Sequence, residues 1–255
     1  MTEGARRIGV IGVATVIAVG LVCVGSTPGS ARQPAIGSVV ASEHAERAGN
    51  VYQVPVAPGR VTIVADSVLS GISAHGELDR LVGTRWDVRM EPCRRLVSPS
   101  CTYGRGTAAP TVLEELQAIA RAGGATGTDD VLLIATGHND SDSRLRDEVG
   151  AIMQASQRAG FERVAWTLYR DQADASLPVL TQSLFAVYGR MNAVLRAEAS
   201  SGRWPLVVLE YGEFTRGQPE WFTADGIHLT REGAVHLADW LSWVIRYDHT
   251  PALRP

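Results

Sequence analysis

Short apolar stretches bounded by turn-forming residues recur along the chain from residue 61 onward. They cover residues 61–66, 86–90, 131–136, 163–169 and 205–211. Most are apolar at consecutive positions, which is typical of strands buried on both faces of a parallel sheet. The stretch at 86–90 is interrupted by Asp87 and Arg89, and we predict an edge strand there.

Helical patterns lie between these stretches. The clearest begins at Thr111, which has the spacing of a capping box with Glu114, and it ends at Gly123 and Gly124. Further helices are predicted over residues 142–160, 178–201 and 230–246. Strands that alternate with helices at this spacing predict an α/β fold, a three-layer α/β/α domain with right-handed crossovers.

The first 25 residues have the pattern of a targeting segment. Arg6 and Arg7 precede an apolar stretch over residues 8–25, which as a transmembrane helix would be about 27 Å long against a hydrocarbon core of roughly 30 Å. The positive flank favours a cytoplasmic amino terminus and export of the remaining chain. Two forms stay open: a single-pass anchor in the cell membrane with the domain outside the cytoplasm, or a signal peptide whose cleavage releases a secreted protein.

Composition divides the rest of the chain into three parts. Residues 26–60 are rich in Ser, Gly, Pro and Ala and are predicted as an extracytoplasmic linker, residues 61–247 as the folded domain, and residues 248–255 as a tail. A chain of 255 residues, 45% of them hydrophobic, can bury one sizeable core. The net charge of −3, with 24 basic residues that are all Arg, provides no basic field for nucleic acid, which is therefore not an expected partner.

Two cysteines, Cys93 and Cys101, lie in the part predicted to be exported, whereas Cys23 lies in the apolar segment. An oxidising compartment favours a disulfide between Cys93 and Cys101, which would stabilise the fold by roughly 2–3 kcal/mol. Clustered histidines are lacking near this pair, and we expect neither a metal nor a cofactor.

Three polar segments carry the candidate chemistry. Ser67 follows the first predicted strand, so its hydroxyl is expected at the carboxyl edge of the sheet. Asp225 and His228 precede the last helix at a spacing that lets the carboxylate orient an imidazole able to deprotonate Ser67. The segment Gly137-His138-Asn139-Asp140 follows another strand and offers an amide donor. The structural alternatives are a turn at Ser67 and a capped helix start after Asp225.

These segments resemble, in their order, the sequence blocks of the SGNH hydrolases, also called GDSL esterases. The family has a Gly-Asp-Ser turn, an oxyanion glycine, a Gly-x-Asn-Asp loop and an Asp-x-x-His segment. This chain has Ala65-Asp66-Ser67, Gly137-His138-Asn139-Asp140 and Asp225-Gly226-Ile227-His228, and the resemblance covers roughly residues 61–245. It is closest to exported SGNH domains found alone or fused to membrane acyltransferases in actinobacteria and other bacteria.

The resemblance implies a flavodoxin-like sheet of about five parallel strands and a role for each motif residue. Ser67 is the implied nucleophile, His228 the base, and Asp225 the residue that orients it. The implied oxyanion donors are the backbone N–H of Ser67 and the side-chain amide of Asn139. By spacing, the oxyanion glycine aligns with Cys93, whose N–H can donate whatever its side chain.

Further positions extend this picture. Gly104 and Gly106 compete with Cys93 for the oxyanion role, and Ala65 stands where the family has glycine, which is tolerated if the turn does not require positive φ. Candidate substrate contacts follow, each with a structural alternative. They are His138 in the asparagine loop, Trp221 before the acid/base segment, which either stacks on a sugar or packs the loop, and Arg94 beside the disulfide.

The sequence thus predicts an exported serine esterase that acts on small acyl esters, such as acetyl groups on cell-envelope glycans. Its expected partners are the acylated glycan substrate, the membrane through the amino-terminal helix, and a membrane acyltransferase as a functional partner. Acyl transfer to a carbohydrate hydroxyl is an alternative, and a surface-anchored carbohydrate-binding module with weak turnover is another.

Overall fold

The computed structural model describes residues 59–102, 106–172 and 176–247. Five strands form one sheet in the order β2-β1-β3-β4-β5, and every neighbouring pair is parallel. The strands are β1 (Arg60–Ala65), β2 (Arg85–Met90), β3 (Val131–Ala135), β4 (Arg163–Thr167) and β5 (Leu206–Leu209). The predicted parallel sheet and its flavodoxin-like order are confirmed.

Helices connect the strands. The α-helices are α2 (Ser67–Ala74), α3 (Val112–Arg121), α4 (Leu145–Arg158), α5 (Val179–Ser200), α6 (Tyr211–Phe214) and α7 (Arg231–Tyr247). Three single-turn 3₁₀ helices are η1 (Leu78–Arg80), η2 (Asp142–Arg144) and η3 (Pro219–Trp221). The predicted capping box is present at α3, where the Thr111 hydroxyl accepts from the Glu114 N–H and the Glu114 carboxylate accepts from the Thr111 N–H.

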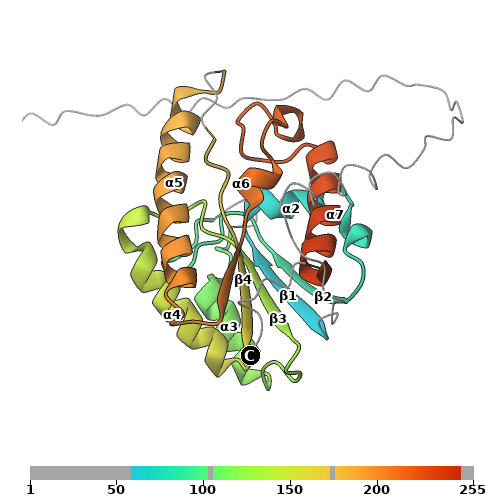
Figure 1. Cartoon of the computed structure of the whole chain (residues 1–255), viewed down its shortest axis with the longest axis vertical. Coiled ribbons are helices and arrows are strands. Elements are labelled where there is room, and N and C mark those ends of the chain that lie inside the picture. The colour runs from blue at the N-terminus through green and yellow to red at the C-terminus, as the bar shows by residue number, and fades with distance from the viewer. Residues whose placement is uncertain (1–58, 103–105, 173–175, 248–255) are drawn as a thin grey trace, which may run out of the picture. The chain divides into compact units, whose positions relative to one another are not determined.

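Helices cover both faces of the sheet, so the domain has the predicted three layers. Helices α3, α4 and α5 lie on one face and α2 and α7 on the other (Figure 1). Alternate strand positions fill two separate cores: Leu132 and Ile134 of β3 face the first set of helices, whereas Leu133 and Ala135 face the second. This alternation is the two-residue period of a strand buried on both sides.

Strand β2 occupies one edge of the sheet, as the charged residues in its sequence predicted. Only β1 pairs with it, and none of its residues is fully buried. The helix predicted over 142–160 is shorter, because a 3₁₀ turn at Asp142–Arg144 precedes α4. Helices α2 and α6 were not predicted, since one or two turns are too short to show a helical period.

The expected targeting segment at 1–25, with Cys23, and the tail at 248–255 lie outside the described residues, as does nearly all of the linker at 26–60. Within the described part of the chain, no helix combines the length and apolarity needed to cross a membrane.

Candidate active site

The parallel sheet brings three distant segments of the chain to its carboxyl edge. Ser67 begins α2 directly after β1, and the segment from Gly137 to Asp140 follows β3. Strands β1 and β3 are neighbours in the sheet, and the chain leaves β1 for β2 on the other side. Such a switch in strand order is where open α/β sheets bind ligands. Asp225 and His228 lie in the connection before α7.

Ser67, His228 and Asp225 form a continuous chain of hydrogen bonds. The Ser67 hydroxyl lies 3.0 Å from Nε2 of His228, and Nδ1 of the same ring lies 2.6 Å from the Asp225 carboxylate. With Nδ1 protonated and bonded to the carboxylate, Nε2 is left as the acceptor for the serine proton. The side chains of His228 and Asp225 are 48% and 44% exposed, so the site is open to solvent.

The Asp225 carboxylate is held within its own loop. Its Oδ1 accepts from the N–H of Ile227 at 2.8 Å, from the N–H of His228 at 3.0 Å and from the hydroxyl of Thr223 at 2.8 Å. Partial burial raises the pKa of Asp225, but the hydrogen bonds from His228, the two backbone amides and Thr223 outweigh it and lower the pKa to about 2. Asp225 is therefore an anion near neutral pH, and these hydrogen bonds fix its orientation.

Ser67 occupies the first position of α2, and Asp66 caps this helix by accepting from the Val68 N–H at 3.1 Å. The N–H of the first helical residue has no acceptor within its helix, and the helix dipole favours negative charge there. Ala65, the last residue of β1, does not have positive φ. The turn therefore does not require glycine at this position, and alanine is tolerated where the SGNH family has glycine.

Asp66 also binds residues 137–140, the asparagine loop, which carries Asn139. Its Oδ2 accepts from the N–H of Gly137 at 3.1 Å, from the N–H of His138 at 3.2 Å and lies 3.0 Å from Nδ1 of His138. Burial raises the pKa of Asp66, but the His138 imidazole and the backbone amides more than offset this, and the pKa lies below its usual value. One buried carboxylate thus fixes the nucleophile turn against the loop that carries Asn139.

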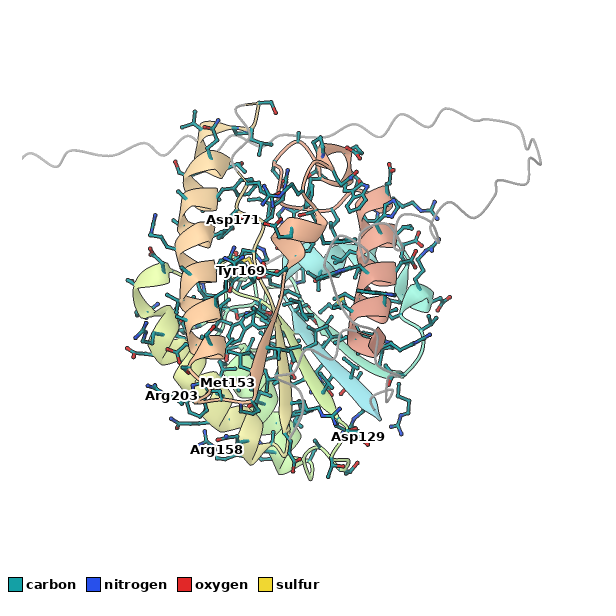
Figure 2. All side chains as sticks on the ribbon, in the orientation of Figure 1. Asp129, Met153, Arg158, Tyr169, Asp171 and Arg203 are labelled. Carbon is teal, nitrogen blue, oxygen red and sulfur yellow. A yellow bond between two sulfur atoms is a disulfide. The ribbon has the colours of Figure 1, made fainter. Side chains whose placement is uncertain are left out.

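His138 is enclosed rather than open to a substrate. Its ring meets Tyr169 and Tyr188 edge-on at 4.8 and 5.2 Å between centroids. Tyr169 lies just beyond the carboxyl end of β4 beside α5 (Figure 2). A Cβ on Gly137, whose φ is +132°, would overlap the Tyr169 hydroxyl, so only glycine fits there. The structure therefore favours a packing role for His138.

Asn139 faces the loop that carries the disulfide. Its side-chain amide donates to the backbone carbonyl of Arg94 at 3.3 Å, which uses one of its two N–H groups. Asp140 continues the contact, because its carboxylate accepts from the Leu96 N–H at 3.1 Å. Burial, with the nearby Glu148, raises the pKa of Asp140 to about 7. The asparagine loop therefore holds the position of the disulfide loop.

Cys93 has the backbone conformation that its alignment with a glycine requires. Its φ is +62°, and it is the one residue other than glycine with positive φ among those the structure describes. The predicted disulfide joins it to Cys101, with 5.3 Å between the Cα atoms. The Glu91 N–H, two residues earlier, donates to the Ala65 carbonyl at 3.1 Å, which ties this turn to the nucleophile strand. Of its competitors, Gly106 also has positive φ, and Gly104 lies outside the described residues.

The structure does not place Arg94 where a substrate reaches it. Its side chain is fully buried, and its guanidinium donates to the carbonyls of Ala65 at 3.1 Å and Pro110 at 2.7 Å and to Glu115 at 3.2 Å. Arg94 thus has a structural role, since its buried guanidinium connects the end of β1 to α3. The sequence could not show this, because all three of these partners are distant from Arg94 in the chain.

Trp221 is also buried, and of its two predicted roles the structure favours packing the loop. Its ring stacks on His236 of α7, with 4.3 Å between centroids, and lies 5.3 Å from Phe214.

No group of three or more potential metal-ligating side chains is found in the described ranges.

Thr223 and Arg170 belong to the site but were not identified from the sequence. Thr223 lies two residues before Asp225, a spacing at which a hydroxyl readily bonds a carboxylate, so a local signal existed. Arg170 donates to the backbone of the Asp225–His228 loop across 56 positions in the chain, and no sequence pattern indicates such a contact.

Comparisons with known proteins address the fold. No family profile and no curated protein sequence matches this chain. The C-terminal catalytic domain of peptidoglycan O-acetyltransferase A from Streptococcus pneumoniae, solved with a methylsulfonyl adduct, is 16% identical with a TM-score of 0.51, over 73% of this chain and 92% of that one. A protein from Slackia heliotrinireducens, provisionally assigned to the SGNH hydrolases, is 19% identical with a TM-score of 0.50, over 72% and 97%.

At these identities a structural match establishes architecture only. The strand order and the three layers agree with the resemblance that the motifs of Ser67, Asn139 and His228 carry. The chain therefore has the three-layer α/β/α fold of the SGNH hydrolases.

Proposed function

We propose that this protein is an exported serine esterase of the SGNH type that cleaves small acyl esters through an acyl-enzyme. One observation carries the proposal: the unbroken hydrogen-bond chain from the Ser67 hydroxyl through His228 to Asp225, at the carboxyl edge of the sheet. A serine hydroxyl is a weak nucleophile, and a base in direct contact that is itself oriented by a carboxylate is what activates it.

In the proposed first step, Ser67 Oγ attacks the ester carbonyl carbon while its proton moves to Nε2 of His228. The tetrahedral intermediate then collapses, the bond to the leaving oxygen breaks, and His228 returns the proton to that oxygen. In the second step water attacks the acyl-enzyme while His228 accepts a proton from the water. The bond from Ser67 Oγ to the acyl carbon then breaks, and His228 passes that proton to Ser67 Oγ as the acid leaves.

The negative charge on the intermediate requires donors, and three are proposed. They are the backbone N–H of Ser67, the side-chain N–H of Asn139 that does not bind Arg94, and the backbone N–H of Cys93. In the part of the chain that the structure describes, neither backbone N–H has an acceptor. The loss of one such donor typically lowers the rate by ~10²–10³-fold.

The proposed substrates are acetyl or other short acyl groups on glycans of the cell envelope. Support comes from the predicted export and from a fold shared with a domain whose name states peptidoglycan O-acetyl transfer. In this proposal the amino-terminal helix holds the domain at the membrane when it is not cleaved, and a membrane acyltransferase supplies or shares the acylated glycan.

Acyl transfer is the second candidate, because the streptococcal domain with this fold is an acetyltransferase. The half-exposed His228 is open to water or to a sugar hydroxyl in the second step. A binding module without turnover is the less favoured alternative, since such a module has no need of an intact Ser67–His228–Asp225 chain.

The test is turnover of p-nitrophenyl acetate and of acetylated oligosaccharides by the oxidised protein, with and without an unacetylated oligosaccharide as acceptor. Ser67→Ala is expected to abolish release of acetate, whereas Ser73→Ala, which changes an exposed serine of the same helix, keeps wild-type turnover. Acetylated acceptor in place of free acetate would establish transfer. If the wild type neither hydrolyses nor transfers the acetyl group, the proposed esterase function is wrong and the binding module becomes the favoured function.

A further inference from the structure

Arg170 lies directly behind the loop that carries Asp225 and His228. It follows β4 at the carboxyl edge of the sheet, and only 7% of it is exposed. The guanidinium carbon lies 4.0 Å from the centre of the Phe222 ring and 5.4 Å from that of Phe185. Contact with these two aromatic faces holds the planar group in one orientation, between α5 and the loop.

The Arg170 guanidinium donates to the backbone of the loop that carries Asp225 and His228. Nη1 of Arg170 donates to the Gly226 carbonyl at 2.6 Å. The N–H of that same peptide belongs to Ile227, and it donates to the Asp225 carboxylate at 2.8 Å. One rigid peptide plane therefore connects Arg170 to Asp225.

Two physical effects follow from this arrangement. Anchoring the carbonyl fixes the rotation of the peptide plane, and with it the direction in which the Ile227 N–H points. A cationic donor on the carbonyl also polarises the amide, so that its N–H becomes a stronger donor to the carboxylate. Both effects hold Asp225 in the position from which it orients His228.

The carbonyl that Arg170 binds belongs to a residue at which only glycine fits. Gly226 has a φ of +71°, and a Cβ there would lie 2.7 Å from a methyl carbon of Leu177. Thr181 of α5 makes the one other side-chain contact to a backbone carbonyl of residues 225–228 found in the described ranges, by donating to the Asp225 carbonyl at 2.9 Å. The loop also has hydrogen bonds of its own, from the Gly226 N–H to the Thr223 carbonyl and from the Thr223 N–H to the His228 carbonyl, each at 2.8 Å. Arg170 and Thr181 add contacts from outside the loop, and Arg170 is the one that holds the 226–227 peptide plane by its carbonyl.

We propose that Arg170 is a positioning residue for the reaction, acting through the 226–227 peptide to hold Asp225 and thereby His228 against Ser67. This inference rests on the proposed function. It assigns to an internal arginine, without contact to substrate, control over the rate of the chemical steps and not over substrate binding.

The test compares Arg170→Met, which retains an extended side chain between the two rings but lacks the donor and the charge, with Arg170→Lys. Arg163→Lys, at the other end of β4, is the matched control. Turnover of p-nitrophenyl acetate by Arg170→Met is expected to fall by about 10²-fold in kcat, the scale of a misplaced catalytic group, with KM within twofold of wild type. Arg170→Lys is expected to fall by less, and the control to match the wild type.

A second readout separates positioning from general damage and does not need turnover. The proton shared by His228 Nδ1 and Asp225 is expected to give a proton NMR signal far downfield in the wild type and in Arg163→Lys. In Arg170→Met the signal is expected to be lost or broadened while the melting curve stays cooperative.

The inference is overturned if folded Arg170→Met keeps both the signal and the wild-type kcat. If that variant does not fold, Arg170→Lys decides: wild-type kcat with an unchanged signal would mean that the stacked guanidinium is not required. A wild type without any turnover would instead refute the proposed function, and the downfield signal would still show whether Arg170 holds Asp225.

Discussion

Asp225 shows how much of the site is determined by contacts within a few residues. Its carboxylate binds groups of Thr223, Ile227 and His228, all within three positions. Because these contacts are local, the spacing of Asp225 and His228 alone was enough to predict their pairing. Arg94 and Arg170 show the opposite case, since their partners are brought together only by the fold, and neither role could be predicted from the sequence.

Changing Asp225 to Asn tests the orienting role at this scale. The amide presents a donor or a neutral oxygen to Nδ1, so the favoured tautomer of His228 is lost, and kcat for a short ester is expected to fall by about 10⁴-fold, as in serine proteases. Thr223→Val removes one of three donors to the same oxygen and is expected to cost far less. Steady-state kinetics of both variants measure this, and an Asn variant within tenfold of wild type would contradict the role of Asp225.

The element of most interest is the loop between Cys93 and Cys101. Sequence spacing aligned Cys93 with a glycine, and the structure gives it a left-handed backbone that costs a residue with a Cβ roughly 1–2 kcal/mol. The disulfide and the contact between Asn139 and the Arg94 carbonyl hold the loop in this conformation. The strands and long helices were predictable because each has a regular pattern of apolar residues over several positions. A turn such as that at Cys93 has no such pattern, because its conformation follows from tertiary contacts.

Two double variants separate the effect of the backbone conformation of residue 93 from the effect of the disulfide. Cys93→Gly with Cys101→Ser removes the bridge but leaves a residue that adopts positive φ readily, and it is expected to keep most of the kcat. Cys93→Ser with Cys101→Ser also removes the bridge but retains the strain, and its kcat is expected to be about tenfold lower than that of the glycine variant. Ester kinetics under oxidising conditions provide the comparison. Equal kcat values in the two variants would show that the conformation of residue 93 does not matter.

At the scale of the whole molecule, buried carboxyl groups link the site to stability. Asp140 has a folded pKa of about 7, against about 3.9 when unfolded. Between these values the folded state binds the extra proton, so this group destabilises the fold as the pH rises from about 4 to about 7. Asp66, whose folded pKa is lowered, acts in the opposite direction, and its contribution is lost as the pH falls below about 4.

Urea unfolding of Asp140→Asn at pH 5 and pH 8 tests this assignment. The amide cannot ionise, so relative to wild type the variant is expected to gain stability between pH 5 and pH 8, by at most about 3 kcal/mol, since only about two pH units of this range lie below the folded pKa of about 7. The Leu96 N–H still finds an acceptor in the amide oxygen. A difference between the two proteins that stays constant from pH 5 to pH 8 would show that Asp140 is ionised at both.

The central claim is that Ser67 is a nucleophile activated by His228, and active-site labelling tests it most directly. The oxidised protein is treated with a fluorophosphonate, and the modified peptide is identified by mass spectrometry. The account predicts one label per chain, on Ser67, absent in Ser67→Ala, unchanged in Ser73→Ala and strongly slowed in His228→Ala. Labelling that persists in Ser67→Ala, or a folded and oxidised wild type that takes up no label, would contradict it.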